Sequence, residues 1–593
     1  MTVSQTGEWV DVRTEAVPGP ATDRWSRVRA RIAAVEEGFG DPWDRSNPVG
    51  HTALLAADEE GELSRAGVEL YDRLGLNAEF VPTRLGGRMD GLDTLGVLMR
   101  PLFRRDATLA VGCALTSLMG AMVVWLNGDE AQQRRTAALL LSGGRATIAF
   151  QRFAHENDFV GDEFTTERGP GGILIKGRKG AINNADTAGL LVAFARAGTG
   201  SGSHSLLLLD PAAVPQDRVR HLPRHRTDAA RGLRISGLEF TDCPLPQDAL
   251  VGAWGQGTEL GLRAFPVIHA TVPSMVVGMA DTALRTAARF ALEKKPFSRP
   301  VTEVSLARNA LAGTFTDLLI ADSLALTAGR ALHLIPENSN VLSAVVKYLV
   351  PKLVGETLYH LSVIMGDAFH SRHGDHAIFQ KHVRDLAMVT FGHVSSALCQ
   401  ATIAPCLPDI AAAGWTAPCA APAGLFRAGE EVPPIDPERL ARFGGRDGLC
   451  AYALLAAESC AALESVDGSD TARTLSRQTE LLVAELTEIR ERCLRLGTEN
   501  GRFVPDSKAF PLTDRYALAV AAACCLGVRS NAEPGSLAAG TDWLVLALHR
   551  ILRRLGLPTP PLPQGLEVRM CEEVLRRARG ARSYDLYDTE LAR

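Results

Sequence analysis

Side chains that could bind a metal ion or move a proton gather between His370 and His376, in the segment HSRHGDH. His370, His373, Asp375 and His376 are all of types that ligate metal ions. The same short, polar, glycine-containing stretch is equally typical of a solvated loop. We expect the loop here, and no metal site.

Nucleophilic and thiol chemistry finds little support in the sequence. The segment GTGSGSHS at 198–205 joins two apolar runs, and small flexible residues between strands predict a hairpin loop. No serine stands there in the Gly-x-Ser-x-Gly arrangement of a nucleophile elbow. The 11 cysteines include no Cys-x-x-Cys pair, which argues against a zinc site or a disulfide framework. We expect reduced, mostly buried thiols.

Composition excludes several classes of function. The 593 residues carry 63 Lys and Arg against 68 Asp and Glu, a net charge of −5, which is too even for general binding to nucleic acid. An apolar content of 46% with 22% charged residues indicates folded domains with large cores. A chain of this length is expected to form several domains.

Two segments bear on location. The first residues, MTVSQTGEWVDVRTEAVPG, lack the apolar run of a secretory signal, so a cytoplasmic location is expected. Residues 107–128 carry no charge and are long enough to cross a bilayer. They also contain several Gly, Ser, Thr and Asn residues, so we expect a buried helix and no membrane insertion.

The pattern of apolar residues predicts an α+β chain of four domains. Long helical periods occupy residues 1–145 and are interpreted as an N-terminal helical domain. Short apolar runs separated by turn residues predict a small antiparallel β-barrel at 146–255. Helical periods return at 256–402 with the lengths of a four-helix bundle. Residues 403–593 are predicted to form an additional C-terminal helical domain.

Six segments in this order resemble the acyl-CoA dehydrogenase family, over about 340 residues. They are LYDRLGLNAEFVPTRLGG at 70–87, RDATLAV from 105, GRKGAINNA at 177–185, LEFTDCPLPQDALVGAWGQG at 238–257, ALEKKPFSRPVTE at 291–303 and HVRDLAM from 382. The resemblance implies FAD bound between barrel and bundle. It also implies a base that takes the α-proton of an acyl thioester while the β-hydrogen leaves as hydride.

The base that the resemblance calls for is not a carboxylate in this sequence. His393 stands nine residues after Arg384, where the family has a glutamate. The alternative base position is Thr271, and His269 lies near the same face of that predicted helix. An imidazole titrates near pH 6.5 and could take the proton, so His393 is the predicted catalytic base. A packed, non-catalytic histidine is the alternative.

Contacts to the flavin are altered as well. The family's flavin turn aligns with QRFAHEND at 151–158, and its strand Trp and Thr become Ala181 and Asn183. Lys294 replaces a phosphate-binding arginine, which keeps the charge without the bidentate fork. The resemblance implies as cofactor-binding residues Gln151, Ala181, Asn183, Lys294, Phe297 and Gly366, and as substrate-binding residues Asn157, His269 and Thr271.

Two hypotheses follow. In the first, the chain is an FAD-dependent oxidoreductase that dehydrogenates an acyl thioester carried by coenzyme A or an acyl carrier protein, with an atypical base. In the second, the fold persists without flavin, and the protein is either a non-redox catalyst on a thioester or a non-catalytic partner subunit. The added C-terminal domain resembles that of larger family members and implies a homodimer.

Overall fold

The computed structural model describes residues 2–3, 9–10, 23–149, 164–169, 171–198, 204–295, 298–391, 396–415, 417–440, 448–496, 498–499, 502–503 and 509–593. The predicted site residues Gln151, Asn157, Phe297 and His393 lie outside these ranges. The chain divides into two compact units. We call Val35–Ile268 with Arg384–Ser395 the sheet unit, and Met1–Ala34, His269–Val383 and Ser396–Arg593 the bundle unit.

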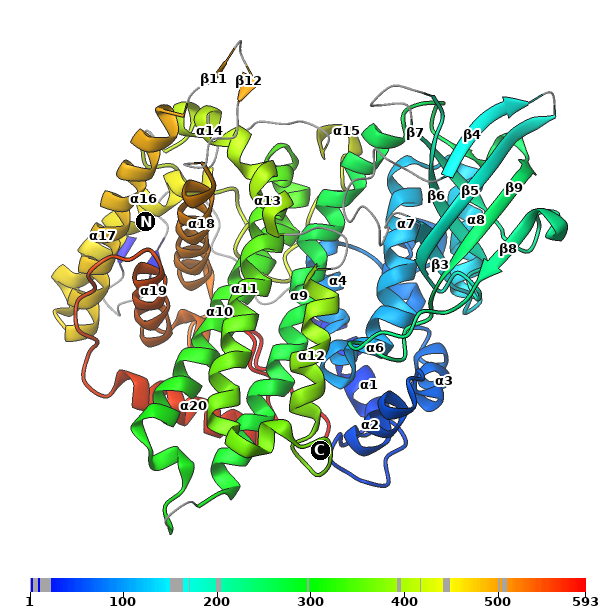
Figure 1. Ribbon diagram of the computed structural model, residues 1–593. Helices are drawn as coiled ribbons and strands as arrows, with labels where there is room; N and C mark the ends of the chain where they lie inside the picture. The colour runs from blue at the N-terminus through cyan, green and yellow to red at the C-terminus, as the bar shows by residue number, and fades with distance from the viewer. Residues whose placement is uncertain are drawn as a thin grey trace. The chain divides into compact units, whose positions relative to one another are not determined.

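Helices open the sheet unit (Figure 1). Asp129 starts one of them with a capping box, because its side chain accepts from the Gln132 backbone N–H while the Gln132 side chain accepts from the Asp129 N–H. After the end of α1 (Asp23–Phe39), the helices are α2 (His51–Glu60), α3 (Arg65–Arg73), α4 (Leu92–Leu98), α5 (Arg100–Arg105), α6 (Ala107–Leu109), a π-helical segment (Ala110–Leu115), α7 (Thr116–Asn127) and α8 (Glu130–Leu141).

A mixed sheet of eight strands follows, in the order β10-β7-β6-β4-β5-β9-β8 with β3 beside β6. Most neighbours are antiparallel, as the sequence predicts, but β3 and β4 each pair in parallel with β6. The strands are β3 (Ala146–Ala149), β4 (Phe164–Gly169), β5 (Gly172–Asn183), β6 (Leu190–Arg196), β7 (His204–Leu209), β8 (Val219–Leu222), β9 (Ile235–Leu245) and β10 (Leu250–Val251).

Lys179 is a buried cation in the core of the sheet. Lys179 is 1% exposed, and its Nζ donates to the carbonyl oxygens of Ala149 at 2.6 Å and Phe194 at 3.2 Å. The same ammonium lies 5.0 Å from the centre of the Phe164 ring. Carbonyl oxygens and the aromatic face therefore replace the water that this charge loses on burial.

The bundle unit is built on long helices. α10 (Ser305–Leu334) is buried almost throughout its second half, because α11 (Ser339–Met365), α18 (Ala509–Asn531), α19 (Asp542–Arg554) and α20 (Leu566–Gly580) all pack against it. Figure 1 shows α16 to α19 gathered beside α10 and α11. The other helices are α9 (Gly257–Glu293, shared with the sheet unit), α12 (Ile378–Phe391, likewise shared), α13 (Ser396–Ile403), α14 (Leu407–Ala413), α15 (Pro437–Leu440), α16 (Gly448–Asp467) and α17 (Asp470–Leu494).

Five helices among the described residues are long and apolar enough to cross a membrane by length and composition. The most apolar one is Ala107–Asn127. In its most apolar stretch of 18 residues, 89% is buried inside the protein. The surface that lipid would contact is therefore already covered by protein side chains there. The predicted domain boundaries at 145, 255 and 402 remain predictions.

Candidate functional site

Asn183, at the end of β5, presents an unused hydrogen-bond acceptor. Its Nδ2 donates to Thr116 Oγ1 at 2.7 Å, and its backbone oxygen accepts from Thr147 Oγ1 at 2.6 Å. Its side-chain Oδ1 is buried and has no hydrogen-bond partner in the described part of the chain. A buried amide oxygen without a donor is costly, so this atom marks a place where a bound group could donate.

Thr116 fixes the orientation of that amide. Its hydroxyl donates to the Val111 carbonyl oxygen at 3.0 Å, so the hydroxyl oxygen accepts from Asn183. Val111 lies in the π-helical segment Ala110–Leu115, a local irregularity that is frequent at functional sites. The neighbouring Asn184, at φ 60, donates from Nδ2 to Gly112 oxygen at 2.7 Å. Two adjacent asparagines thus tie the end of β5 to this segment.

Ala181 lies in an irregular stretch of β5. The pairing of β5 with β9 shifts between Lys179 and Ile182, which leaves Gly180 and Ala181 outside the regular register. Such bulges re-aim side chains. Ala181 is partly exposed. Ala181 and Asn183, two positions apart on β5, are the predicted site residues that lie in the described part of the sheet unit.

Arg384 and Asp385 form the buried polar centre of the sheet unit. Arg384 donates to both Asp58 carboxylate oxygens, at 2.8 and 2.5 Å, and to Asp385 at 2.9 Å. Asp385 accepts in addition from the Ala230 N–H at 2.7 Å and from Thr108 Oγ1 at 3.3 Å. Burial opposes the guanidinium charge, but hydrogen bonds and charge from the two aspartates raise the Arg384 pKa above its ordinary value.

This centre anchors α12 on the segments that precede the sheet. Arg384 and Asp385 are the Arg-Asp pair of the segment HVRDLAM, which the sequence analysis singled out. Their partner Asp58 lies in no motif that the sequence analysis identified. The predicted base His393 follows α12 but lies outside the described residues.

The bundle unit holds four further predicted residues. His269 and Thr271 both lie on α9, where Thr271 is 2% exposed and His269 is partly exposed. Residues two positions apart on a continuous helix point about 200° apart, so the expectation that they share a face is wrong. Lys294 is exposed just after α9, and Gly366 ends α11 at φ 53, a value that disfavours a side chain.

The histidine segment at 370–376 contacts a glutamate at the end of α9. His376 Nε2 lies 3.3 Å from Glu293 Oε2, and its ring packs edge-on against Phe290 at 5.4 Å. Burial lowers the His376 pKa, against the opposing charge of Glu293. Across the described ranges, no three His, Cys, Asp or Glu side chains are grouped to hold a metal ion.

Comparison with known proteins places the chain among its relatives. No family model matches it. The human short-chain specific acyl-CoA dehydrogenase, mitochondrial, is 27% identical over 262 residues, which cover 43% of this chain and 62% of that protein. The short-chain specific acyl-CoA dehydrogenase of Megasphaera elsdenii is 22% identical over 252 residues, 41% of this chain and 65% of the relative. These relatives and the structural neighbours of the chain are acyl-CoA dehydrogenases.

Solved structures extend the likeness of this chain to its C-terminal helices. An acyl-CoA dehydrogenase complexed with FAD from Bacillus anthracis aligns over 96% of this chain and 98% of its own, with a TM-score of 0.62 and 16% identity. Butyryl-CoA dehydrogenase from Megasphaera elsdenii aligns over 65% of this chain and 98% of its own, with a TM-score of 0.57 and 16% identity. The predicted fold with extra C-terminal helices is confirmed. The curated match spans less than two thirds of the first two relatives.

Proposed function

We propose that the chain is an FAD-dependent oxidoreductase that introduces a double bond between the α and β carbons of an acyl thioester. The α carbon loses a proton to a base and the β carbon loses a hydride. When bound, FAD would supply the acceptor for that hydride. The observation that carries the proposal is the buried, unpartnered Oδ1 of Asn183 at the end of β5, in a family whose relatives include an FAD complex.

The described residues fit a planar, hydrogen-bonding cofactor. Asn183 offers an acceptor whose direction Thr116 holds fixed, and the β5 irregularity at Ala181 offers backbone without a bulky side chain. Lys294, exposed just after α9, is the proposed phosphate contact. Gln151, Phe297 and Gly366 complete the proposed cofactor set.

His393 is the proposed base. Its neutral imidazole would accept the α-proton and hold it as imidazolium. Thr271 is buried on α9, and a hydroxyl cannot take this proton near neutral pH. Asn157, His269 and Thr271 are the proposed contacts to the thioester, which is carried by coenzyme A or by an acyl carrier protein.

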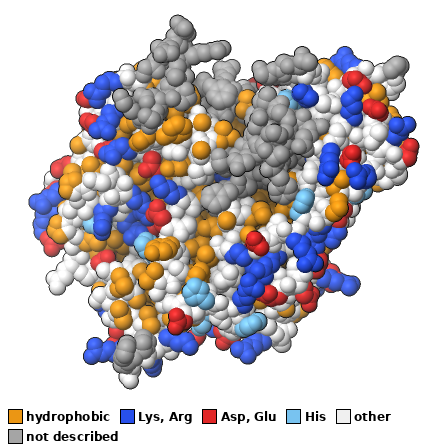
Figure 2. Space-filling model, in the orientation of Figure 1, with side chains coloured by type: hydrophobic (Ala, Val, Ile, Leu, Met, Phe, Trp, Pro, Cys, Tyr) orange, Lys and Arg blue, Asp and Glu red, His pale blue; other side chains and the backbone are white. Residues whose placement is uncertain are grey.

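A homodimer in the cytoplasm is the proposed working form. Tyr359 and Val363, one turn apart on α11, are 68% and 56% exposed, and Leu306 on α10 is 71% exposed. Figure 2 shows hydrophobic side chains on the viewed face in the region of these two helices. Exposed apolar side chains of this kind support burial against a second copy.

The test is FAD retention followed by substrate bleaching. Purified protein supplied with FAD is expected to be yellow after gel filtration, and an acyl thioester is expected to bleach it without oxygen. His393→Ala should keep the colour and lose the bleaching, whereas His373→Ala, which changes an exposed histidine, should retain both. Unchanged bleaching in His393→Ala would remove that residue from the mechanism.

The flavin-free hypothesis is the second candidate. It is favoured by the replacement of the family's Trp, Thr and Arg by Ala181, Asn183 and Lys294. A non-redox catalyst or partner subunit would stay colourless after exposure to FAD, and the same gel-filtration experiment separates the two.

A further inference from the structure

A cavity of about 460 Å³ lies within the bundle unit, and none of the residues assigned above to flavin or thioester lines it. Its walls come from the start of α1, the end of α18, α20 and the C-terminal residues 586–588. This volume is in the range of small-molecule sites, which combine apolar walls with a few polar groups.

One wall is aromatic. Trp25 is 5% exposed, and its ring centre lies 5.0 Å from that of Tyr587, at 53°. Leu326 and Phe426, both buried, line the cavity as well. This wall offers flat apolar surface to a planar ligand.

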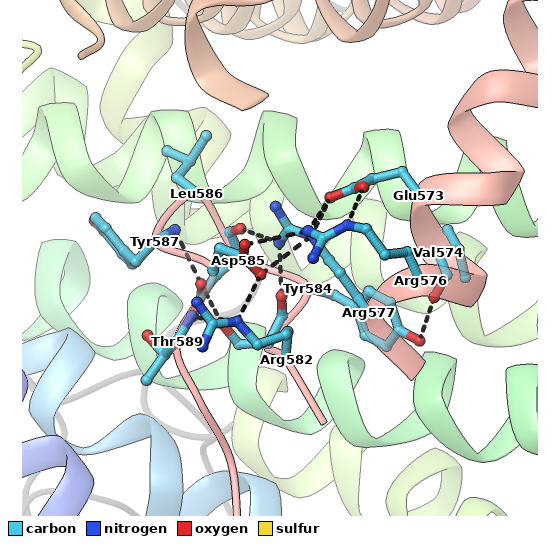
Figure 3. A network of polar contacts seen from close by, with 12 residues as sticks. Glu573, Val574, Arg576, Arg577, Arg582, Tyr584, Asp585, Leu586, Tyr587 and Thr589 are labelled. Carbon is cyan, nitrogen blue, oxygen red and sulfur yellow. Dashed lines mark hydrogen bonds and ion pairs between the residues drawn. The ribbon is translucent and has the colours of Figure 1, made fainter. Parts of the chain in front are cut away.

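Arg577 contributes an unmet donor. The residue is fully buried, with Nη1 donating to the carbonyl oxygens of Ser583 at 2.6 Å and Asp585 at 2.8 Å, and Nε donating to Glu573 at 2.7 Å (Figure 3). Its Nη2 is buried and makes no hydrogen bond to any described residue. A buried guanidinium N–H without an acceptor is destabilising.

The charges of the lining leave a positive site near the aromatic wall. Glu573 pairs with Arg576 at 2.6 Å and with Arg577 at 2.7 Å, and Asp588 pairs with Arg576 at 3.1 Å and with Arg582 at 3.4 Å. Three arginines thus balance these two carboxylates. Arg29 is exposed and lies over the Trp25 ring at 5.7 Å, and no ion pair joins it to a described carboxylate. The remaining acid of the lining, Glu533, lies on an exposed loop.

We propose that this cavity binds a small aromatic carboxylate. The ring packs against Trp25 and Tyr587, and the carboxylate accepts hydrogen bonds from two of the four arginines of the lining, Arg29 at the aromatic wall and Arg577 within the cavity. The site is distinct from the residues of the proposed dehydrogenation and goes beyond that function.

The ligand chemistry is tested by calorimetric titration of the full-length protein with three probes. 2-Naphthoate is expected to bind saturably. The neutral isostere 2-naphthamide should bind at least about tenfold more weakly, because it lacks the charge. Inorganic phosphate, which lacks the ring, should give no saturable heat. Equal binding of naphthoate and naphthamide, saturable binding of phosphate, or no saturable binding of naphthoate at millimolar concentration would each overturn the proposal.

Variants locate the binding. Arg29→Gln should weaken the binding of naphthoate at least about tenfold. Arg27 is an exposed arginine of the same helix that lies outside the lining, so Arg27→Gln should leave naphthoate binding unchanged. Ala532→Trp, which fills the cavity, should abolish binding, with circular dichroism checking that the helices remain. If naphthoate binds Arg29→Gln and Ala532→Trp as it binds the parent protein, the ligand lies elsewhere and the proposal is wrong.

Discussion

Arg384 on α12 and Asp58 on α2 form a bidentate ion pair, with Nη1 and Nη2 at 2.8 and 2.5 Å from the two carboxylate oxygens. The Asp58 side chain is 3% exposed and that of Arg384 is 14% exposed. Two parallel hydrogen bonds between a guanidinium and a carboxylate are geometrically specific. The pair therefore fixes the start of the segment that carries the proposed base.

Breaking this pair should destabilise the protein strongly. Asp58→Ala or Arg384→Met is each expected to cost about 3–5 kcal/mol of unfolding free energy, because the remaining charge stays buried. The double variant should cost less than the sum of the two. Denaturant unfolding measures this coupling. The exposed pair Arg65 and Glu69 serves as control, with an expected coupling below about 0.5 kcal/mol, and a coupling as small for Arg384 would contradict the account.

Asn183 should affect flavin affinity through its side chain. Asn183→Ala removes the unpartnered Oδ1 and is expected to weaken FAD binding about tenfold. Thr147→Val is the matched control, because it loses only the hydrogen bond to the Asn183 backbone oxygen. Equilibrium titration followed by visible absorbance compares the two. Equal FAD affinity in Asn183→Ala and the parent protein would exclude Asn183 from the cofactor site.

Because of Lys347, the free energy of unfolding should increase as the pH rises above about 8. Burial lowers its pKa from 10.5 to about 8, slightly offset by the nearby Cys399. Between pH 8 and 10.5 the unfolded state binds the extra proton, so stability rises with pH across that window. Lys347→Met should flatten this rise and add on the order of 3 kcal/mol at pH 7. Thermal unfolding from pH 7 to 10 is the measurement, with the exposed Lys295→Met as control, and parallel curves for the variant and the parent protein would contradict the prediction.

The C-terminal residues should depend on buried aspartates of the bundle. Asp281 Oδ2 accepts from the Tyr584 N–H at 2.9 Å, and its Oδ1 lies 3.1 Å from Arg285. Asp281→Ala leaves both donors without this acceptor and is expected to cost about 3 kcal/mol and to speed tryptic cleavage after Arg582. Glu480→Ala, on an exposed face of α17, should change neither. A tail as protease-resistant in Asp281→Ala as in the parent would show that this contact does not hold it.

Local patterns in the sequence predicted the order of helical and β segments, because amphipathic periods and turn residues act over short range. They did not predict that β3 pairs in parallel with β6, since a strand's partner depends on the whole sheet. Asp58 was likewise missed as the partner of Arg384, because 326 positions separate them.

Single side chains in the site were harder to predict than the fold. The sequence showed that asparagine stands at position 183 in place of the family's threonine. It could not show that the side-chain oxygen of Asn183 has no partner, because the amide is oriented by Thr116. Thr116 lies in an apolar stretch that was interpreted as a buried helix. The shared face expected for His269 and Thr271 fails on elementary helix geometry, because positions two apart diverge.

Anaerobic reaction of the FAD-loaded protein with a panel of acyl thioesters tests the central claim most directly. The account predicts loss of flavin colour with at least one thioester, and a product two hydrogens lighter by mass spectrometry. A protein that takes up no FAD, or that stays yellow with every thioester and forms no unsaturated product, would contradict it.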